Sequence, residues 1–400
     1  MALLPVADAL ARILDGVVPL PSESIAIGAA VGRVLTDPVI ARRDQPPFAA
    51  SAMDGYAVRH EDVATLPASL VVAGVSAAGR TYRKALKPGQ AIRILTGAPV
   101  PEGADTVVIQ ENTRRNGDRL TVEHATAKGR NIRRQGLDFH KDDVLLDALQ
   151  RLRPRDIGLA AAGNAAKLRV RRKPHVILFT TGDELVLPGE RPRPDQIISS
   201  NSNAIAAMAE SLGARVSNLG IVRDTLAATK AAVRRGLKGD VLLSTGGASV
   251  GDHDYVREDF KACGIKIGFW KIAMRPGKPF MYGRKGKVHV MGLPGNPVSA
   301  LITARLFLRP LLDALQGLTT DSRPVTARLG VAMPANDERQ DYIRATLEVA
   351  DDGRRTVTPF SLQDSSMQRT LQMAQALIIR PALAPAAAAG DSVPILLLDF

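Results

Sequence analysis

Residues 240–254 read Asp-Val-Leu-Leu-Ser-Thr-Gly-Gly-Ala-Ser-Val-Gly-Asp-His-Asp, and this stretch decides the fold class. The apolar run 241–243 ends abruptly in the small-residue loop 244–247. A short apolar run bounded by glycines predicts a strand of a parallel sheet, buried on both faces. The glycines permit a sharp turn and let a ligand approach the backbone without a Cβ in the way. Open α/β sheets bind ligands at the carboxyl ends of their strands, so the loop is a candidate binding loop.

The bulk composition is that of a multi-domain globular chain. Four hundred residues, 45% hydrophobic and 23% charged, predict roughly two to four domains. A single cysteine, Cys263, excludes an intrachain disulfide and is typical of a reducing cytoplasm. The apolar runs fall short of the ~18 residues that a membrane span needs, and residues 1–20 have the pattern of an amphipathic helix. We therefore expect a cytoplasmic protein without a membrane anchor.

The net charge of +13 raises the question of nucleic-acid binding. Basic residues concentrate in the segments 114–134 and 151–173. A basic surface attracts anions of any kind, including phosphates and oxyanions. Trp270 is the only tryptophan, and no recognition helix, zinc finger or RNA-binding signature is visible. We therefore expect no nucleic-acid partner and interpret most of these arginines as a solvated basic face.

The sequence pattern changes along the chain and indicates several domains. A helical pattern with apolar residues at the helix period opens it, and short β-rich runs follow, with a hairpin signal at Asn116-Gly117. Alternating apolar runs and helical segments from about residue 169 predict a mostly parallel sheet. Strands return after residue 321, with a hairpin turn at 351–353. The expected domains are 1–44 with 137–168, then 45–136, 169–320 and 321–400.

Three predicted strands end in small-residue loops, at 181–184, 244–247 and 293–297. Because parallel strands share one carboxyl edge, these loops are expected to converge there. Free backbone N–H groups at such turns suit anions. Any one of these loops alone is weak evidence, because a Gly-Gly after a strand is commonly only a tight turn.

Acidic and basic side chains accompany these loops. Glu184, Asp252 and Asp254 lie in or shortly after these loops, and Asp224 follows a further predicted strand at 216–222. A bound Mg²⁺ would explain why like charges gather beside an anion site. Two structural alternatives stay open: Asp224 as a helix N-cap and Glu184 as a surface carboxylate. No His/Cys ligand set predicts zinc. The segment 271–279 holds three cations beside prolines and a glycine, which favours phosphate or oxyanion binding.

Six motifs in this order resemble one family. They are residues 51–57 (Ser-Ala-Met-Asp-Gly-Tyr-Ala), 96–101 (Thr-Gly-Ala-Pro-Val-Pro), 181–185 (Thr-Gly-Asp-Glu-Leu), 246–252 (Gly-Gly-Ala-Ser-Val-Gly-Asp), 276–279 (Pro-Gly-Lys-Pro) and 293–297 (Leu-Pro-Gly-Asn-Pro). The chain is similar, from about Val6 to its C-terminus, to the molybdopterin molybdenumtransferases, the MoeA and gephyrin E-domain family. The resemblance implies an elongated first domain split around a small β domain, a molybdopterin-binding three-layer α/β domain and a β-barrel-like C-terminal domain. It also implies a homodimer whose active cleft combines the β domain of one subunit with the last two domains of the other.

The resemblance implies a Mg²⁺-dependent reaction of adenylylated molybdopterin with molybdate that gives molybdenum cofactor and AMP. Catalytic roles then fall to Asp54, Glu184, Asp224 and Asp254, the last three also as tentative Mg²⁺ ligands. The implied substrate-binding residues are Thr96, Ser244, Gly246, Gly247, Lys271, Arg275, Lys278, Pro294, Pro297, Ser299, Arg344 and Ser365. Lys278, Ser299, Arg344 and Ser365 are the candidates for holding molybdate. Other proteins of molybdenum-cofactor biosynthesis are the implied further partners.

Three departures from the family pattern bear on these residues. Arg275 stands where many relatives have lysine, which turns a point charge into a planar fork. Ala49-Ala50 replaces a frequent Asp-Asn, and Asp364 replaces a frequent glycine beside Ser365. Two alternatives to the transferase stay open: a molybdopterin adenylyltransferase-like enzyme, whose glycine loop usually continues Gly-Thr-Gly, and a non-enzymatic molybdopterin-binding scaffold.

Overall fold

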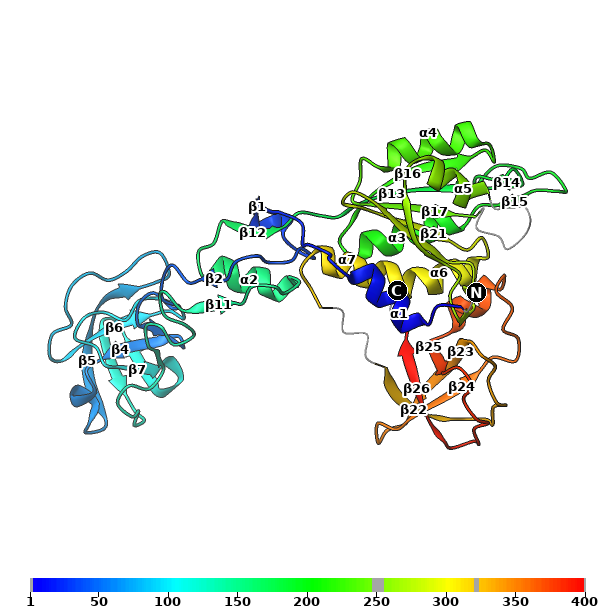
Figure 1. Ribbon diagram of the computed structural model, residues 1–400. Coiled ribbons are helices and arrows are strands. Elements are labelled where there is room, and N and C mark those ends of the chain that lie inside the picture. The colour runs from blue at the N-terminus through cyan, green and yellow to red at the C-terminus, as the bar shows by residue number, and fades with distance from the viewer. Residues whose placement is uncertain (1–2, 247–254, 320–323, 399–400) are drawn as a thin grey trace. The chain divides into compact units, whose positions relative to one another are not determined.

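The computed structural model describes residues 3–246, 255–319 and 324–398, which form two compact units (Figure 1). The smaller unit comprises Ser24–Val31 and Leu35–Val170, and the larger unit comprises Met1–Glu23, Gly32–Val34 and Arg171–Phe400. Within the described ranges, no helix combines the length and the apolar character needed to cross a membrane.

The smaller unit is built on a six-stranded sheet of order β7-β4-β6-β5-β9-β8. Its strands are β4 (Gly55–Val58), β5 (Ala68–Ser76), β6 (Gln90–Ile94), β7 (Thr106–Ile109), β8 (Thr113–Asn116) and β9 (Arg119–Val122). Alternation along β5 buries Leu70 and leaves Val71 exposed, as expected of a strand with one face in a core. The short β-rich runs and the Asn116-Gly117 hairpin predicted from the sequence are confirmed.

A second core of the smaller unit forms around α2 (Pro154–Ala162). Two-stranded sheets flank it: β1 (Ser22–Ala26) with β12 (Lys167–Arg171), and β2 (Val39–Ile40) with β11 (Val144–Leu146), while β3 (Ala50–Ser51) pairs with β10 (Ile132–Arg133). Three short turns of helix, η1 (Ile27–Ala29), η2 (His60–Val63) and η3 (Gln110–Asn112), connect strands. The Arg153 backbone N–H donates to Asp156 (2.8 Å), which closes the first turn of α2.

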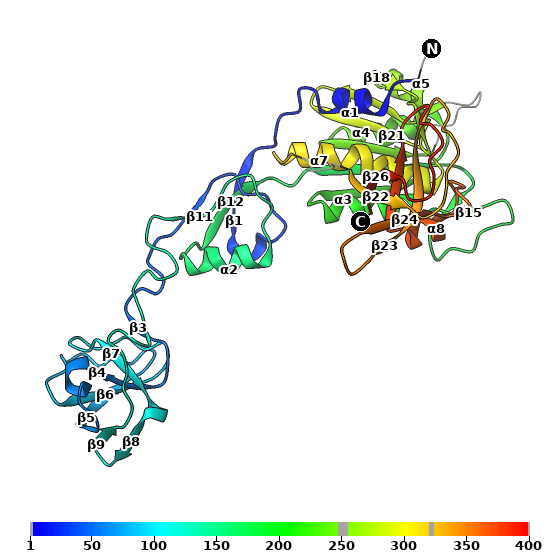
Figure 2. The same ribbon diagram turned by 90° about the horizontal axis from the view of Figure 1, so that it is seen from below.

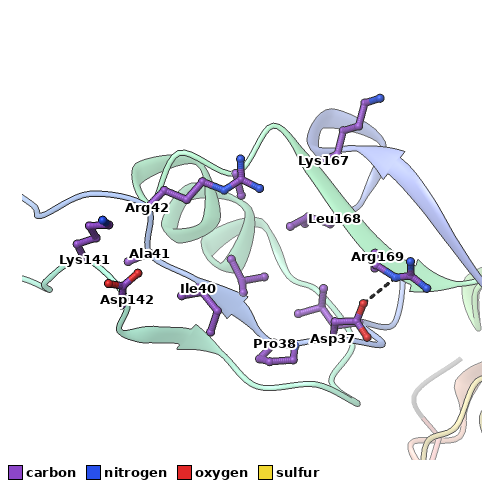
Figure 3. A pocket seen from close by; sticks show the side chains of 13 residues that line it. Asp37, Pro38, Ile40, Ala41, Arg42, Lys141, Asp142, Lys167, Leu168 and Arg169 are labelled. Atoms are coloured by element: carbon purple, nitrogen blue, oxygen red, sulfur yellow. Dashed lines mark ion pairs between the residues drawn. The ribbon is translucent and has the colours of Figure 1, made fainter.

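A cavity of about 390 Å³ lies between residues 35–42 and 165–169 of the smaller unit (Figure 3). Its buried lining includes Leu35 and Leu168, whereas Arg42 and Lys167 are exposed. An ion pair joins Asp37 to Arg169 at 2.7 Å. The cavity contains no predicted site residue, and Lys167 and Arg169 of its lining belong to the solvated basic face expected from the segment 151–173.

The larger unit holds a six-stranded sheet of order β16-β13-β17-β21-β20-β18. The parallel strands are β13 (His175–Thr181), β16 (Arg215–Val222), β17 (Val241–Thr245) and β21 (Val288–Leu293); β18 (Lys266–Trp270) and β20 (Met281–Lys285) run antiparallel. The mostly parallel sheet predicted from the sequence is confirmed. The antiparallel extension was not predicted, because residues 281–285 include glycine and two cations rather than a continuous apolar run.

Helices cover both faces of this sheet and give three layers. Val241 and Leu243 of β17 face one core, which includes residues of α1 (Val6–Leu14), α3 (Asn201–Ser211), α6 (Pro297–Thr303), the π-helical η4 (Ala304–Leu308) and α7 (Arg309–Leu315). Leu242 faces the opposite core with residues of α4 (Leu226–Gly236) and α5 (Tyr255–Ala262). The α1 helix lies along α7 in both views (Figures 1 and 2). Short strands β14 (Leu185–Val186) and β15 (Ile197–Ile198) extend the loop after β13.

The C-terminal part of the larger unit is a closed barrel. It is formed by β22 (Val325–Leu329), β23 (Gln340–Val349), β24 (Arg355–Pro359), β25 (Ala376–Arg380) and β26 (Ser392–Leu397), and closes because β23 pairs with both β24 and β25. The short strand β19 (Met274–Arg275) adds to its edge, and α8 (Gln368–Met373) packs beside it. The barrel-like C-terminal domain and the hairpin at 351–353 are confirmed.

Candidate functional site

The three predicted loops meet at the carboxyl edge of the parallel sheet. β17 lies between β13 and β21, with Thr245 paired to Thr180 on one side and to Leu293 on the other. The loops line a cavity of about 420 Å³. Its lining comprises Thr180, Thr181, Glu184, Leu185, Ile197, Ile198, Ser199, Ser200, Asn201, Thr245, Gly246, Gly295, Asn296, Pro297, Ser366 and Gln368.

Gly246 fits this junction because it has no side chain. Its φ is +86°, and a Cβ built there would lie 2.3 Å from the Thr181 carbonyl oxygen. A Cβ on Gly295 would lie 3.6 Å from the Gly246 Cα, so the third loop is also in contact. The glycine therefore brings three backbone segments together, as the sequence predicts for this loop.

Asn201 ties two of the loops together. Its buried side-chain amide donates to the Thr245 hydroxyl (3.1 Å) and to the Gly295 carbonyl oxygen (2.7 Å). Asn201 is the first residue of α3, and Ser200 before it is the N-cap residue without a capping side-chain bond. The bridging role was missed because an asparagine at a helix start has no sequence signal beyond capping.

Buried hydroxyl groups line the floor of the cavity. Thr180 and Ser199 are 3% exposed, and neither side-chain oxygen has a hydrogen-bond partner among the described residues. Such groups are rare in native proteins and indicate a ligand or water. Ser244, a predicted contact, is fully buried in β17 behind the loop, so it does not line the cavity.

Glu184 and Asp224 are close enough to interact electrostatically. Partial burial, followed by the charges of Asp183 and Glu184, raises the pKa of the Asp224 carboxyl. The N-cap alternative for Asp224 is wrong, because Thr225 is the cap residue of α4 and accepts the Ala228 N–H at 3.3 Å. Asp224 is thus a carboxylate held beside two others without a capping role.

Among residues 3–246, 255–319 and 324–398, no three His, Cys, Asp or Glu side chains form a metal-binding group. Two of the predicted Mg²⁺ ligands, Glu184 and Asp224, belong to the described part. Asp254 and Gly247 lie outside the described residues.

The cationic segment 271–279 holds its side chains in different ways. Arg275 forms a bidentate ion pair with Asp341, with Nε 2.8 Å from Oδ1, and this pairing raises the Arg275 pKa. The Lys271 ammonium lies 3.7 Å from the centre of the Trp270 ring, in a cation–π contact. Lys278 is half-buried and has no ion-pair partner within the described part of the chain. Of the three, Lys278 is therefore best placed to attract an anion.

Arg344 is 1% exposed, and its pKa is lowered by that burial. Its Nη1 donates to the Met367 carbonyl (3.1 Å), its Nη2 to the Asp364 carbonyl (2.9 Å) and its backbone N–H to Gln363 (3.0 Å). The guanidinium thus holds the loop that carries Ser365.

Ser365 itself is tied to the third loop. Its hydroxyl accepts from the Asn296 side chain (2.8 Å), and its carbonyl accepts from the Val298 N–H (3.0 Å). Pro294 and Ser299 are buried beside it, whereas Pro297 lines the cavity at the start of α6. The C-terminal region therefore contributes to the same cavity edge.

Asp54 and Thr96 lie together in the smaller unit. The Thr96 N–H (2.7 Å) and hydroxyl (2.8 Å) both donate to Asp54 Oδ1, and these bonds lower the Asp54 pKa. The adjacent Gly55 allows close pairing of β4 and β7, because a Cβ there would lie 2.0 Å from the Val108 carbonyl oxygen. Two of the six motifs thus form one tethered pair of loops.

Family models match nearly the whole chain. A model described as a probable molybdopterin binding domain matches residues 177–314, the α/β sheet and its cavity. The fold and the site therefore define a molybdopterin-binding α/β domain within a multi-domain chain. Models of the MoeA N-terminal region (domain I and II) and C-terminal region (domain IV) match residues 4–163 and 326–398. The chain belongs to the MoeA family.

Individual relatives agree with this assignment. A molybdopterin molybdenumtransferase of Nostoc sp. is 37% identical over 82% of this chain and 78% of its own length. One from Haemophilus influenzae is 33% identical over 94% of both chains. The crystal structure of a molybdopterin biosynthesis MoeA protein from Pyrococcus horikoshii superimposes with a TM-score of 0.83 at 28% identity over 99% of both chains. The family comprises transferases of molybdenum-cofactor biosynthesis, which favours this activity over the adenylyltransferase alternative.

Proposed function

We propose that this chain transfers molybdenum from molybdate to adenylylated molybdopterin, releasing AMP and forming molybdenum cofactor. The observation that carries the proposal is the 420 Å³ cavity, where three backbone loops and unpartnered hydroxyls meet beside a pair of acids. Hydrogen-bond donors that are already fixed before binding suit a polar, phosphate-bearing ligand, because little conformational entropy is lost when the ligand binds.

The binding role falls to the loop residues. The backbone N–H group of Gly246, together with the hydroxyls of Thr180 and Ser199, would hold oxygen atoms of the substrate. Lys278 would attract molybdate or a phosphate group. Arg344 and Arg275 act as positioning residues, because the first holds the Ser365 loop and the second fixes β19 against Asp341.

The acids fit a magnesium ion. Carboxylate oxygens are the donors Mg²⁺ prefers. The pKa of Asp224 is raised by partial burial and, after it, by the charges of Asp183 and Glu184, and a bound cation would relieve the repulsion between these charges. Glu184 and Asp224 would hold the ion, with Asp254 as a third ligand. When bound, Mg²⁺ neutralises phosphate charge and acts as a Lewis acid at the phosphoanhydride.

The same acids can orient the attacking oxygen. The phosphoanhydride bond between molybdopterin phosphate and AMP breaks as a water oxygen bonds to the molybdopterin phosphorus, and AMP leaves with the bond electrons. Asp224, with its raised pKa, would accept the proton of that nucleophile. Molybdenum bonds to the two thiol sulfurs of molybdopterin as one molybdate oxygen leaves as water with the two thiol protons. The Asp54–Thr96 pair of the smaller unit would complete the site in a homodimer working in the cytoplasm, with other cofactor-biosynthesis proteins as its partners.

One assay tests the reaction. Purified protein is incubated with adenylylated molybdopterin, molybdate and Mg²⁺, and AMP is measured. We expect AMP release that depends on molybdate and is lost in Asp224→Asn and in Asp254→Asn. AMP release without molybdate would indicate a hydrolase instead, and near-normal turnover in both variants would reject the catalytic role of the acids. Light scattering of the same samples tests the homodimer.

A further inference from the structure

A second cavity, of about 450 Å³, lies at the opposite edge of the α/β sheet. Asp240, at the start of β17, and His289, near the start of β21, line it, together with the tip of the β20–β21 hairpin and the segment 16–21 after α1. Because β17 and β21 are parallel, this is the amino edge, whereas the candidate functional site occupies the carboxyl edge. The cavity is therefore separate from the proposed reaction site.

The charges that line this cavity do not cancel. Asp240 is already neutralised, because Arg172 donates to both of its oxygens (3.0 and 2.8 Å) and the His175 N–H donates to one (2.8 Å). Arg284 and Lys287, both on the hairpin, remain as two further cations. An excess of positive charge in a concave site attracts an anion.

Arg284 is held in place by uncharged oxygens. It donates to the Tyr282 hydroxyl (2.6 Å) and to the carbonyl oxygens of Ile13 (3.1 Å) and Asp15 (2.6 Å). These bonds fix the guanidinium without neutralising it. The site is thus ordered before any ligand arrives, which lowers the cost of binding.

His289 contributes a buried imidazole ring to the lining of this cavity. The residue is 4% exposed and lies directly opposite Arg284 across the two strands. Its Nδ1 is 2.9 Å from the Tyr282 hydroxyl, and burial holds its pKa at about 4, so the ring is neutral near pH 7. The Tyr282 hydroxyl accepts from Arg284, and it lies within hydrogen-bond distance of both the Ile13 carbonyl oxygen (3.3 Å) and His289 Nδ1. The contact with Nδ1 therefore accommodates the ring proton on either nitrogen.

Apolar side chains form the remaining wall. Pro19, Leu20, Pro21 and Leu315 line the cavity beside the cations. We propose that this cavity binds a small organic anion, with its oxyanion group against Arg284 and Lys287, beside the ring of His289, and its apolar body against this wall. Phosphate and carboxylate groups share the required chemistry.

Nuclear magnetic resonance of the full chain tests the site at His289 itself. The chain has six histidines, and the His289 ring signal is identified by its loss in His289→Gln. Phenyl phosphate and benzoate are titrated in turn, since they share an apolar body and differ in the anionic group. We expect at least one to shift the His289 signal saturably, and the stronger of the two identifies the anionic group.

Two lysines of the same hairpin give a matched pair of variants. Lys287 lines the cavity, whereas the Lys285 ammonium donates to the Cys263 carbonyl (2.5 Å). Lys287→Ala should weaken binding about three- to fivefold, and Lys285→Ala should leave it unchanged. The proposal is overturned if neither compound shifts the His289 signal or if both variants weaken binding equally. Inorganic phosphate binding as tightly as phenyl phosphate would overturn the role of the apolar wall. None of these outcomes depends on AMP release.

Discussion

The contact between Gly246 and the Thr181 carbonyl gives the sharpest test of the three-loop site. In Gly246→Ala the new methyl group would lie 2.3 Å from that oxygen, a distance that real Cβ atoms essentially never show. A residue other than glycine at positive φ costs about 1–2 kcal/mol, and overpacking against backbone adds about 1–3 kcal/mol. We therefore expect Gly246→Ala to lower the free energy of unfolding of this domain by about 2–5 kcal/mol.

Gly220 provides the matched control. Its φ is +81°, close to that of Gly246, but a Cβ there meets nothing within 4 Å. Gly220→Ala should therefore carry only the backbone cost of about 1–2 kcal/mol. The difference between the two variants isolates the steric clash from the conformational strain.

Urea unfolding followed by fluorescence measures both variants. Trp270, the only tryptophan, ends β18 of the same sheet, so its emission reports this domain. AMP release is measured in parallel, and we expect it to fall further in Gly246→Ala than in Gly220→Ala. Equal stabilities of the two variants, with equal AMP release, would refute the close packing of the loops.

Three further changes test other parts of the site. Asn201→Ala removes two hydrogen bonds that join the loops and should cost about 1–3 kcal/mol in the same urea assay, whereas the exposed Asn203→Ala on the same helix should cost almost nothing. Arg344→Met frees the Asp364 and Met367 carbonyls, so hydrogen exchange over residues 361–368 should rise about tenfold or more; unchanged exchange would mean that the guanidinium does not hold the loop. Asp224→Asn should stabilise the fold at neutral pH, because the raised pKa of Asp224 means that its charged form is disfavoured in the folded state. The difference in free energy of unfolding between Asp224→Asn and the unchanged protein should shrink as the pH falls from above the raised pKa to below the ordinary value of 3.8. A difference that grows on acidification would contradict the raised pKa of Asp224.

The carboxyl-edge loops could be predicted from the sequence because topology alone places them. Short apolar runs ending at Thr181, Thr245 and Leu293 identify parallel strands, and parallel strands share an edge. The side-chain environments could not be predicted in the same way. Arg344 matches a family position for molybdate, yet the structure places its guanidinium in a buried clamp on the Ser365 loop. Burial and partner choice depend on segments distant in sequence, here residues 363–367.

Arg275, which stands where many relatives have lysine, shows how a partner distant in sequence changes the role of a motif residue. The resemblance indicated that charge is kept while a point charge becomes a planar fork. In the structure the planar guanidinium of Arg275 pairs with both carboxylate oxygens of Asp341. A lysine could not form this bidentate pair, so its ammonium would be freer to meet a substrate anion. Within segment 271–279, the anion-binding role consequently falls more heavily on Lys278.

The two edges of the sheet differ in how their residues are brought together. At the carboxyl edge, each loop follows its own strand, so spacing along the chain suffices to find it. At the amino edge, Arg284 and His289 meet through an antiparallel pairing of β20 with β21, and Tyr282 joins them from two residues away. No periodic apolar pattern marks β20, so neither this strand nor its pairing with β21 was expected. A cavity formed by cross-strand pairs therefore has no signature in one sequence, which is why the amino-edge site follows from the structure alone.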